Sequence, residues 1–219
     1  MLTLYGVHRS RASRPIWLLH EIGMDYVHVP VIQGYRLADP AAVGAPFNTT
    51  SAAFLKVNPM GQIPAMVDDG LLLTESLAIC LHIARKYGGT LGPLGVDETA
   101  QAENWALFAA TSLETPGIDI LYTYADGLAD TPEGAAKIAA GVEALRRPMA
   151  RLEGHLAGRD WLTGDRFTVA DVMVAECLRY GSADKPMMAA HPLTTAWLAR
   201  CQARPAFQKM MTARLAEPA

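Results

Sequence analysis

The chain has 219 residues. It has few cysteines, no large excess of positive or negative charge, and no long hydrophobic run. Its three cysteines, Cys80, Cys177 and Cys201, lie far apart and form no C-x-x-C pair, which argues against a disulfide framework and a zinc cluster. No run approaches the ~18 apolar residues of a membrane span, and the first residues lack the regions of a signal peptide. We therefore expect a cytoplasmic protein without a membrane partner.

The charge balance is close to neutral. Lys and Arg number 19 against 22 Asp and Glu, so no strongly basic face for nucleic acid is expected. Apolar residues make up 51% of the chain and charged residues 19%, which favours a packed globular protein. The sequence has no G-x-S-x-G, P-loop or G-x-G-x-x-G motif, and its histidines show no metal-ligand spacing. We therefore predict no metal and none of the common hydrolase or nucleotide-binding activities.

The first 88 residues alternate between strand and helix patterns. Residues 2–5 are a β-type run, residues 12–22 show helical spacing up to Gly23, and residues 26–29 are β-branched or aromatic. Asp69-Gly70 between two apolar runs predicts a hairpin, and Thr74 is a suitable cap for the helix that follows. Residues 34–53 have no period and predict an irregular connection. The predicted order is β-α-β, then β-β-α.

The second part of the chain has only helical patterns. Four glycines and one proline between Gly88 and Asp97 indicate a domain junction. Helical periodicity then covers residues 99–115, 132–156, 169–180, 193–203 and 205–215. We predict an α/β domain over residues 1–88, a linker over 89–97 and an all-helical domain over 98–219. Thr168 and Asp171 form a capping box, so Asp171 is interpreted as structural rather than catalytic.

Four segments carry a resemblance to a known family. They are Leu4-Tyr5-Gly6 followed by Ser10-Arg11-Ala12-Ser13-Arg14, the loop from Asn58 to Pro64, the helix start Thr74-Glu75-Ser76, and the box from Phe167 to Asp171. In this order they resemble the bacterial-like, serine-type members of the cytosolic glutathione transferase family, over nearly the whole chain. The resemblance implies a thioredoxin-like N-terminal domain that binds glutathione, a helical-bundle C-terminal domain, a homodimer and a detoxification role.

The resemblance also implies a set of glutathione contacts. Pro64 follows a cis peptide bond, and Ile63 pairs its backbone with the cysteinyl part of glutathione. Glu75 and Ser76 hold the γ-glutamyl end, where a helix N-terminus favours a carboxylate. Helix capping alone is the structural alternative for these two residues. Gln62 is a further polar contact.

The expected reaction needs a thiolate, whereas a free thiol with a pKa near ~8.5 is mostly protonated at neutral pH. Ser10, with Arg14 four residues later, resembles the serine of serine-type members, whose hydroxyl donates a hydrogen bond to the thiolate. Such a hydroxyl cannot be the base. Ser13 and Tyr5 are rivals for this role, and Arg11 either adds a positive field at the sulfur or is solvated.

The second substrate is expected to be a small hydrophobic electrophile. Trp105, Phe108, Ser112 and Tyr122 are the pocket candidates, with helix core as the alternative for the two larger rings. Isomerase, dehalogenase, ether-cleaving and peroxidase reactions use the same thiolate and stay open, as does a non-catalytic binding protein. Glutaredoxin-like exchange is disfavoured because no cysteine precedes Cys80. The 34–53 segment is longer than the family connection, and we expect it to border the glutathione pocket.

Overall fold

The computed structural model describes residues 1–218. The chain divides into an α/β unit, which contains residues 1–88 and the segment from Pro205 onward, and a helical unit of residues 89–204. The predicted fold class, an α/β part followed by helices, is confirmed. The predicted division differs at one place, because the sequence assigns the segment after residue 204 to the helical domain. Residue 219 of that predicted domain lies outside the described residues.

The sheet of the α/β unit has the predicted strands. Within the described residues it has four strands in the order β2-β1-β3-β4. Their bounds are β1 Leu2–Tyr5, β2 Val27–Val29, β3 Ala65–Asp68 and β4 Leu71–Thr74. The β1 and β2 strands are parallel, whereas β1–β3 and β3–β4 are antiparallel. Asp69 and Gly70 turn the β3–β4 hairpin with φ of 50° and 88°, the left-handed values that an Asp-Gly turn supplies.

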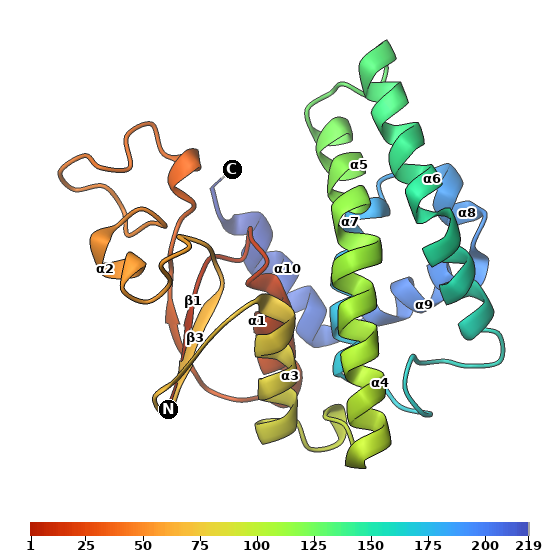
Figure 1. Cartoon of the computed structure of the whole chain (residues 1–219), viewed down its shortest axis with the longest axis horizontal. Coiled ribbons are helices and arrows are strands. Elements are labelled where there is room, and N and C mark those ends of the chain that lie inside the picture. Colours follow the sequence, from red (N-terminus) through yellow and green to blue (C-terminus); the bar gives the residue numbers. More distant parts are fainter. Residues whose placement is uncertain (219) are drawn as a thin grey trace. The chain divides into compact units, whose positions relative to one another are not determined.

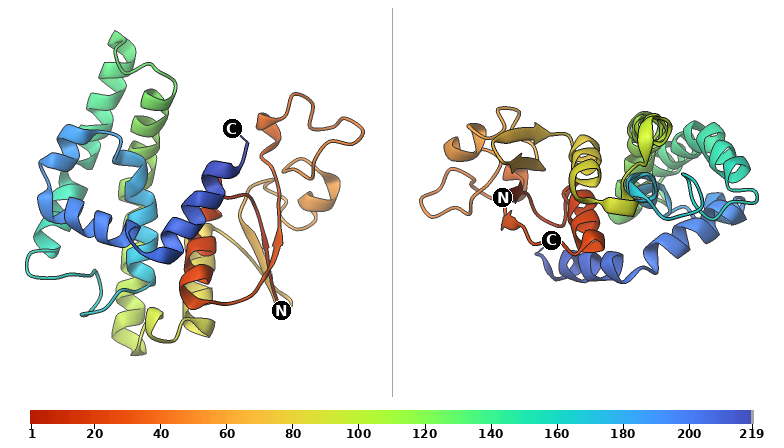
Figure 2. Two further views of the ribbon diagram at one scale, coloured as in Figure 1. Left: turned by 180° about the vertical axis from the view of Figure 1, so that it is seen from behind. Right: turned by 90° about the horizontal axis from the view of Figure 1, so that it is seen from below.

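Three helices pack together beside this sheet. They are α1 (Ser13–Ile22), α3 (Ser76–Tyr87) and α10 (Pro205–Ala216). Figures 1 and 2 show α3 and α10 on either side of α1. The fully buried ring of Trp17 on α1 meets Phe207 of α10 edge to face, with centroids 4.9 Å apart. This packing explains why the last helix belongs to the α/β unit, since α1 has apolar side chains on more faces than the sheet and α3 cover.

The 34–53 connection is irregular, as predicted. It contains the 3-10 turn η1 (Gly34–Arg36) and leads into α2 (Ala52–Leu55). The buried Asn48 amide organises it, because its Nδ2 donates to the carbonyls of Pro40 and Pro46 while its Oδ1 accepts from the N–H and hydroxyl of Thr50. This side chain thus supplements the isolated backbone bridge between Ile32 and Asn48, in a segment that forms no regular strand.

The helical unit contains the predicted helices and two that the sequence patterns miss. Its elements are η2 Gly89–Leu91, α4 Gly95–Phe108, η3 Ala109–Glu114, α5 Thr115–Ala125, α6 Pro132–His155, α7 Val169–Gly181, α8 Lys185–Ala189 and α9 Pro192–Gln202. The helices α5 and α8 are the unpredicted ones. The run Thr115-Pro116-Gly117 is expected to break or kink the helix, and the chain passes through the π-helical η3 directly before it and continues into α5. Pro116 falls in the first turn of α5, where a missing N–H is tolerated.

The capping box of α7 has the expected geometry. Asp171 accepts hydrogen bonds from the N–H of Thr168 at 2.9 Å, the N–H of Leu162 at 3.0 Å and the indole of Trp197 at 2.9 Å. Burial raises the pKa of Asp171, although these hydrogen bonds act in the opposite direction. The carboxyl joins three segments of the helical unit, which confirms its structural role.

No helix in residues 1–218 is long and apolar enough to cross a membrane.

Candidate functional site

The N-terminus of α3 forms one end of the candidate site. Glu75 precedes the helix with φ 65° and ψ 107°, a backbone conformation that costs a non-glycine residue about 1–3 kcal/mol. Its side chain is exposed, and Ser76 behind it is buried. The prediction that Thr74 caps this helix is wrong, because Thr74 is the last residue of β4 and Glu75 occupies the position before the helix. The first N–H groups of α3 have no partner within the helix and can receive an anion.

A buried arginine reaches the same helix start from α1. Arg14 is 1% exposed, and its Nη1 donates to the Ser76 hydroxyl oxygen at 2.8 Å. The Ser76 proton stays available as a donor, because the oxygen accepts this bond with a lone pair. The positive charge of Arg14 adds to the positive end of the α3 dipole. Sequence reasoning identified Arg14 only by its spacing from Ser10; the further signal is an arginine directly before the apolar run from Pro15 to Leu19.

A polar cluster fixes α3 to the sheet. The carboxylate of Asp68, at the end of β3, accepts from His82 at 2.7 Å, Lys86 at 2.8 Å and Tyr87 at 2.8 Å. Burial alone would raise the pKa of Asp68, but hydrogen bonds from these three side chains lower it to about 2. All three donors lie on α3, so the helix is held along its length as well as at its start.

The loop from Asn58 to Pro64 lies next to β3. The peptide bond between Ile63 and Pro64 is cis, as the resemblance implies. The buried Asn58 side chain donates to the carbonyl of Gln62 at 2.7 Å and accepts from the N–H of Met60 at 3.1 Å. Ile63 is buried and the Gln62 side chain is exposed, so Gln62 is accessible to a ligand.

The loop of residues 7–11, between β1 and α1, carries Ser10. The partly exposed Ser10 hydroxyl donates to the carbonyl of Val7 at 2.6 Å and accepts from the N–H of Ala12 at 3.0 Å. Gly6, directly before this loop, has φ 149°, and a Cβ there would lie 2.8 Å from the Ala12 Cβ. The turn into α1 therefore depends on the missing side chain of Gly6, and it places Ser10 near the start of the helix.

The two rivals of Ser10 occupy different surroundings. Ser13, the first residue of α1, is fully buried. The Tyr5 ring packs against Phe54, with centroids 6.3 Å apart, in a small apolar cluster. Arg11 is exposed beside Ser10. Among these hydroxyls only Ser10 combines partial exposure with a loop position.

The chain has clear relatives of known family. Residues 4–91 match the model for the glutathione S-transferase N-terminal domain, and residues 119–205 match that for the C-terminal domain. Glutathione S-transferase 3 of Zea mays is 34% identical, over 97% of this chain and 94% of the relative. The chain belongs to the glutathione S-transferase family. The predicted family and enzyme class are thereby confirmed, and glutathione transfer is favoured over the alternative activities.

Solved structures of other glutathione S-transferases have the same fold. Glutathione S-transferase III in its apo form has 32% sequence identity and a TM-score of 0.78, covering 100% of this chain and 99% of the other. The theta class glutathione S-transferase of Xanthomonas axonopodis pv. citri, a structure with glutathione bound, has 26% identity and a TM-score of 0.71, covering 95% of each chain. The thioredoxin-like fold predicted for the N-terminal domain is confirmed.

The predicted substrate-pocket residues of this glutathione S-transferase fall into two groups. Trp105 and Phe108 are buried at 4% and 6% exposure, and the guanidinium of Arg151 lies 4.7 Å and 4.3 Å from their ring centroids. These contacts place both rings in the packing of the helical unit. Ser112 is partly exposed and Tyr122 is 53% exposed. Their contact with a substrate stays a prediction.

No group of three or more His, Cys, Asp or Glu side chains in residues 1–218 is arranged to hold a metal ion.

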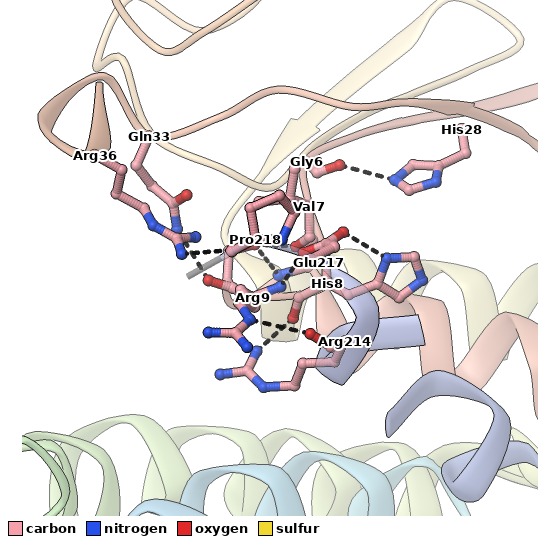
Figure 3. A network of polar contacts seen from close by, with 12 residues as sticks. Gly6, Val7, His8, Arg9, His28, Gln33, Arg36, Arg214, Glu217 and Pro218 are labelled. Atoms are coloured by element: carbon pink, nitrogen blue, oxygen red, sulfur yellow. Dashed lines mark hydrogen bonds and ion pairs between the residues drawn. The ribbon is translucent and has the colours of Figure 1, made fainter. Parts of the chain in front are cut away.

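Sequence reasoning missed a contact from the far end of the chain. Glu217, which follows α10, accepts hydrogen bonds from the backbone of His8 and Arg9, directly before Ser10 (Figure 3). Nothing in the local sequence around Glu217 indicates such a partner.

Proposed function

We propose that this glutathione S-transferase binds glutathione on its α/β unit and that Ser10 donates a hydrogen bond to the thiolate. The observation that carries the assignment is the environment of the Ser10 hydroxyl, which is partly exposed and already accepts from the Ala12 N–H at 3.0 Å. That bond polarises the hydroxyl and makes it a better donor. The proton that now points to Val7 reaches a thiolate by rotation about the Cβ–Oγ bond, without movement of the oxygen.

The groups at this loop can supply the free energy that is needed to lower the pKa of the glutathione thiol. Lowering a thiol pKa by ~2 from ~8.5 needs ~2.7 kcal/mol. A hydrogen bond to a charged group supplies ~1.5–3 kcal/mol, and the N-terminus of α1 adds ~0.3–1 kcal/mol. Arg11 contributes further positive potential at the same place. No buried base is needed.

The α3 end of the site is proposed to hold the γ-glutamyl group. Its carboxylate binds the first N–H groups of α3 and the Ser76 hydroxyl, supported by the charge of Arg14. The exposed Glu75 carboxylate faces the ammonium group. Ile63 pairs its backbone with the cysteinyl part, next to Pro64, and Gln62 adds a side-chain contact.

The thiolate then attacks a small hydrophobic electrophile, forming a carbon–sulfur bond as the leaving group departs with its electron pair. We propose that Ser112 and Tyr122, the accessible candidates of the helical unit, contact this molecule. A homodimer, a cytoplasmic location and a detoxification role are proposed from the resemblance. Sedimentation of the purified chain tests the dimer.

The decisive experiment is the titration of bound glutathione by its thiolate absorbance in the wild type and in Ser10→Ala. We expect the pKa of the bound thiol to rise by ~1–2 and kcat/KM to fall ~10- to 100-fold, since one charge-assisted hydrogen bond is lost. Ser13→Ala and Tyr5→Phe serve as matched controls. A shift that persists in Ser10→Ala but disappears in either control reassigns the role to that hydroxyl.

A further inference from the structure

His8 and Arg9, the two residues before Ser10, form backbone hydrogen bonds with side chains from distant parts of the chain. Strand β1 ends at Tyr5 and α1 begins at Ser13, so His8 and Arg9 belong to no regular element. The N–H and the carbonyl of each residue nevertheless form a hydrogen bond, and in all four bonds the partner is a side chain far away in the sequence. The backbone of these two residues is therefore held by distant side chains rather than by the other residues of the loop.

Glu217 supplies the central contact. One carboxylate oxygen accepts from the His8 N–H and from the His8 Nδ1, each at 2.8 Å, and the other accepts from the Arg9 N–H at 2.8 Å. Because an ionised carboxylate only accepts, the Nδ1 of His8 carries a proton in this contact. Burial raises the pKa of Glu217, but the hydrogen bonds from His8 and Arg9 outweigh this effect and the net pKa is lowered. Glu217 is thus ionised at neutral pH.

Further side chains contact the backbone of this loop and of the segment around Glu217 (Figure 3). The Arg214 guanidinium donates to the carbonyl of His8, and the Gln33 amide donates to the carbonyl of Arg9 at 3.1 Å. In return Arg9 Nε donates to the carbonyl of Arg214 at 3.1 Å. Arg36 donates to the carbonyl of Pro218 at 3.0 Å, which ties the end of the segment to η1. Arg214 on α10 and Glu217 just after it therefore both contact the backbone of His8 or Arg9.

We propose that Glu217, assisted by Arg214, is a positioning residue for thiolate activation. It fixes the backbone of His8 and Arg9 and so sets where the next residue, Ser10, presents its hydroxyl. The inference rests on the role proposed above for Ser10. Misplacement of a reacting group by about 1 Å can cost ~100-fold in rate, so a contact this close to Ser10 affects catalysis without touching glutathione. The strength of charge-assisted bonds to backbone N–H groups suits this task.

The test compares Glu217→Gln with Glu143→Gln, which removes an exposed carboxylate paired with Arg146 on α6. An amide at 217 keeps one acceptor oxygen and turns an NH2 group toward a backbone N–H, so the loop loses part of its support. With chlorodinitrobenzene as electrophile, we expect kcat to fall ~10-fold, the pKa of bound glutathione to rise by ~0.5–1, and KM for glutathione to change less than ~2-fold. Arg214→Met should produce a smaller shift of the same sign, and Glu143→Gln none.

The outcomes separate this proposal from the role of Ser10. A lower melting temperature in Glu217→Gln with unchanged kcat and thiol pKa makes the contact merely structural and overturns the proposal. Higher activity makes Glu217 an inhibitory contact and also overturns it. If Ser10→Ala shifts the thiol pKa and Glu217→Gln does not, the positioning role alone fails. If Glu217→Gln shifts it and Ser10→Ala does not, positioning is supported and another group of the loop contacts the sulfur.

Discussion

The two ends of the candidate glutathione site are built in different ways. At the α3 end, Arg14 and Asp68 are buried side chains that tie the helix to α1 and to β3. At the sulfur end, Val7 is buried in an apolar cluster, but the backbone of His8 and Arg9 is held by partly exposed side chains, chiefly Glu217 after α10. The proposed binding end is thus held by buried polar side chains, whereas the proposed activating end is a loop held in part by side chains at the protein surface.

This difference indicates how binding and catalysis can be altered separately. Substitution of the buried Arg14 should lower stability and glutathione affinity together, because the same contact serves both, whereas substitutions of the exposed Glu75 should separate the two. Substitutions around the loop should change the thiolate and the rate while the free energy of unfolding stays nearly constant. The following changes at the α3 end test this contrast.

Arg14→Met should have the largest effect. It keeps the aliphatic stem but removes the hydrogen bond to Ser76 and the charge under the α3 N-terminus, so we expect the free energy of unfolding to fall by ~3 kcal/mol. KM for glutathione should rise at least ~10-fold. Denaturant unfolding and steady-state kinetics measure both, with the exposed Arg85→Met as the control. A destabilised variant with unchanged KM would show that the two functions of this end are separate.

Asp68→Asn should cost ~2 kcal/mol at pH 7. The pKa of Asp68 falls from 3.8 to about 2 on folding, so its contribution is complete above ~pH 4 and is lost as the pH drops through 2. The difference in unfolding free energy between wild type and variant should therefore shrink between pH 4 and pH 2. Asp160→Asn, at a side chain 77% exposed, is the control and should cost under ~0.5 kcal/mol. A difference that does not change with pH would contradict the role of the carboxylate charge.

Glu75→Gly should have the smallest and most specific effect. Glycine adopts a φ of 65° freely, so relief of strain should outweigh the added freedom of the unfolded chain and raise stability by ~0.5–1 kcal/mol. Glutathione affinity should fall, because the carboxylate is lost. Glu75→Gln, which keeps the strain, should lose affinity without gaining stability. If the glycine variant is less stable than the wild type, the backbone of Glu75 is not strained.

Local features could be predicted from the sequence because their partners are neighbours in the chain. The Asp69-Gly70 turn and the Thr168 to Asp171 capping box each depend on residues within one turn, and both have the expected geometry. Candidate residues in the glutathione region were found through motifs that also lie in short segments. All the residues that interact in such a pattern lie in one short segment, so the pattern can be interpreted without the rest of the fold.

Contacts across the chain could not be predicted in this way. Arg14 and Ser76 are 62 positions apart, and Glu217 lies 209 positions from His8. Neither pair has a sequence pattern, because the fold alone brings the residues together. For the same reason the sequence groups residues 205–215 with the other helices, since a helical pattern does not show which helix will pack against it. The sequence names Ser10 as a candidate, but it does not indicate that Glu217 contacts the two residues before it.

The return of α10 to the α/β unit has a consequence for synthesis on the ribosome. The sheet, α1 and α3 are translated first, yet Trp17 lacks the cover of Phe207 until the helical unit has been made. The helical unit is continuous in sequence and can fold as soon as it emerges, because domains generally fold as units. Although its strands are translated first, the α/β unit therefore gains its packing between α10 and α1 only after the helical unit has been translated.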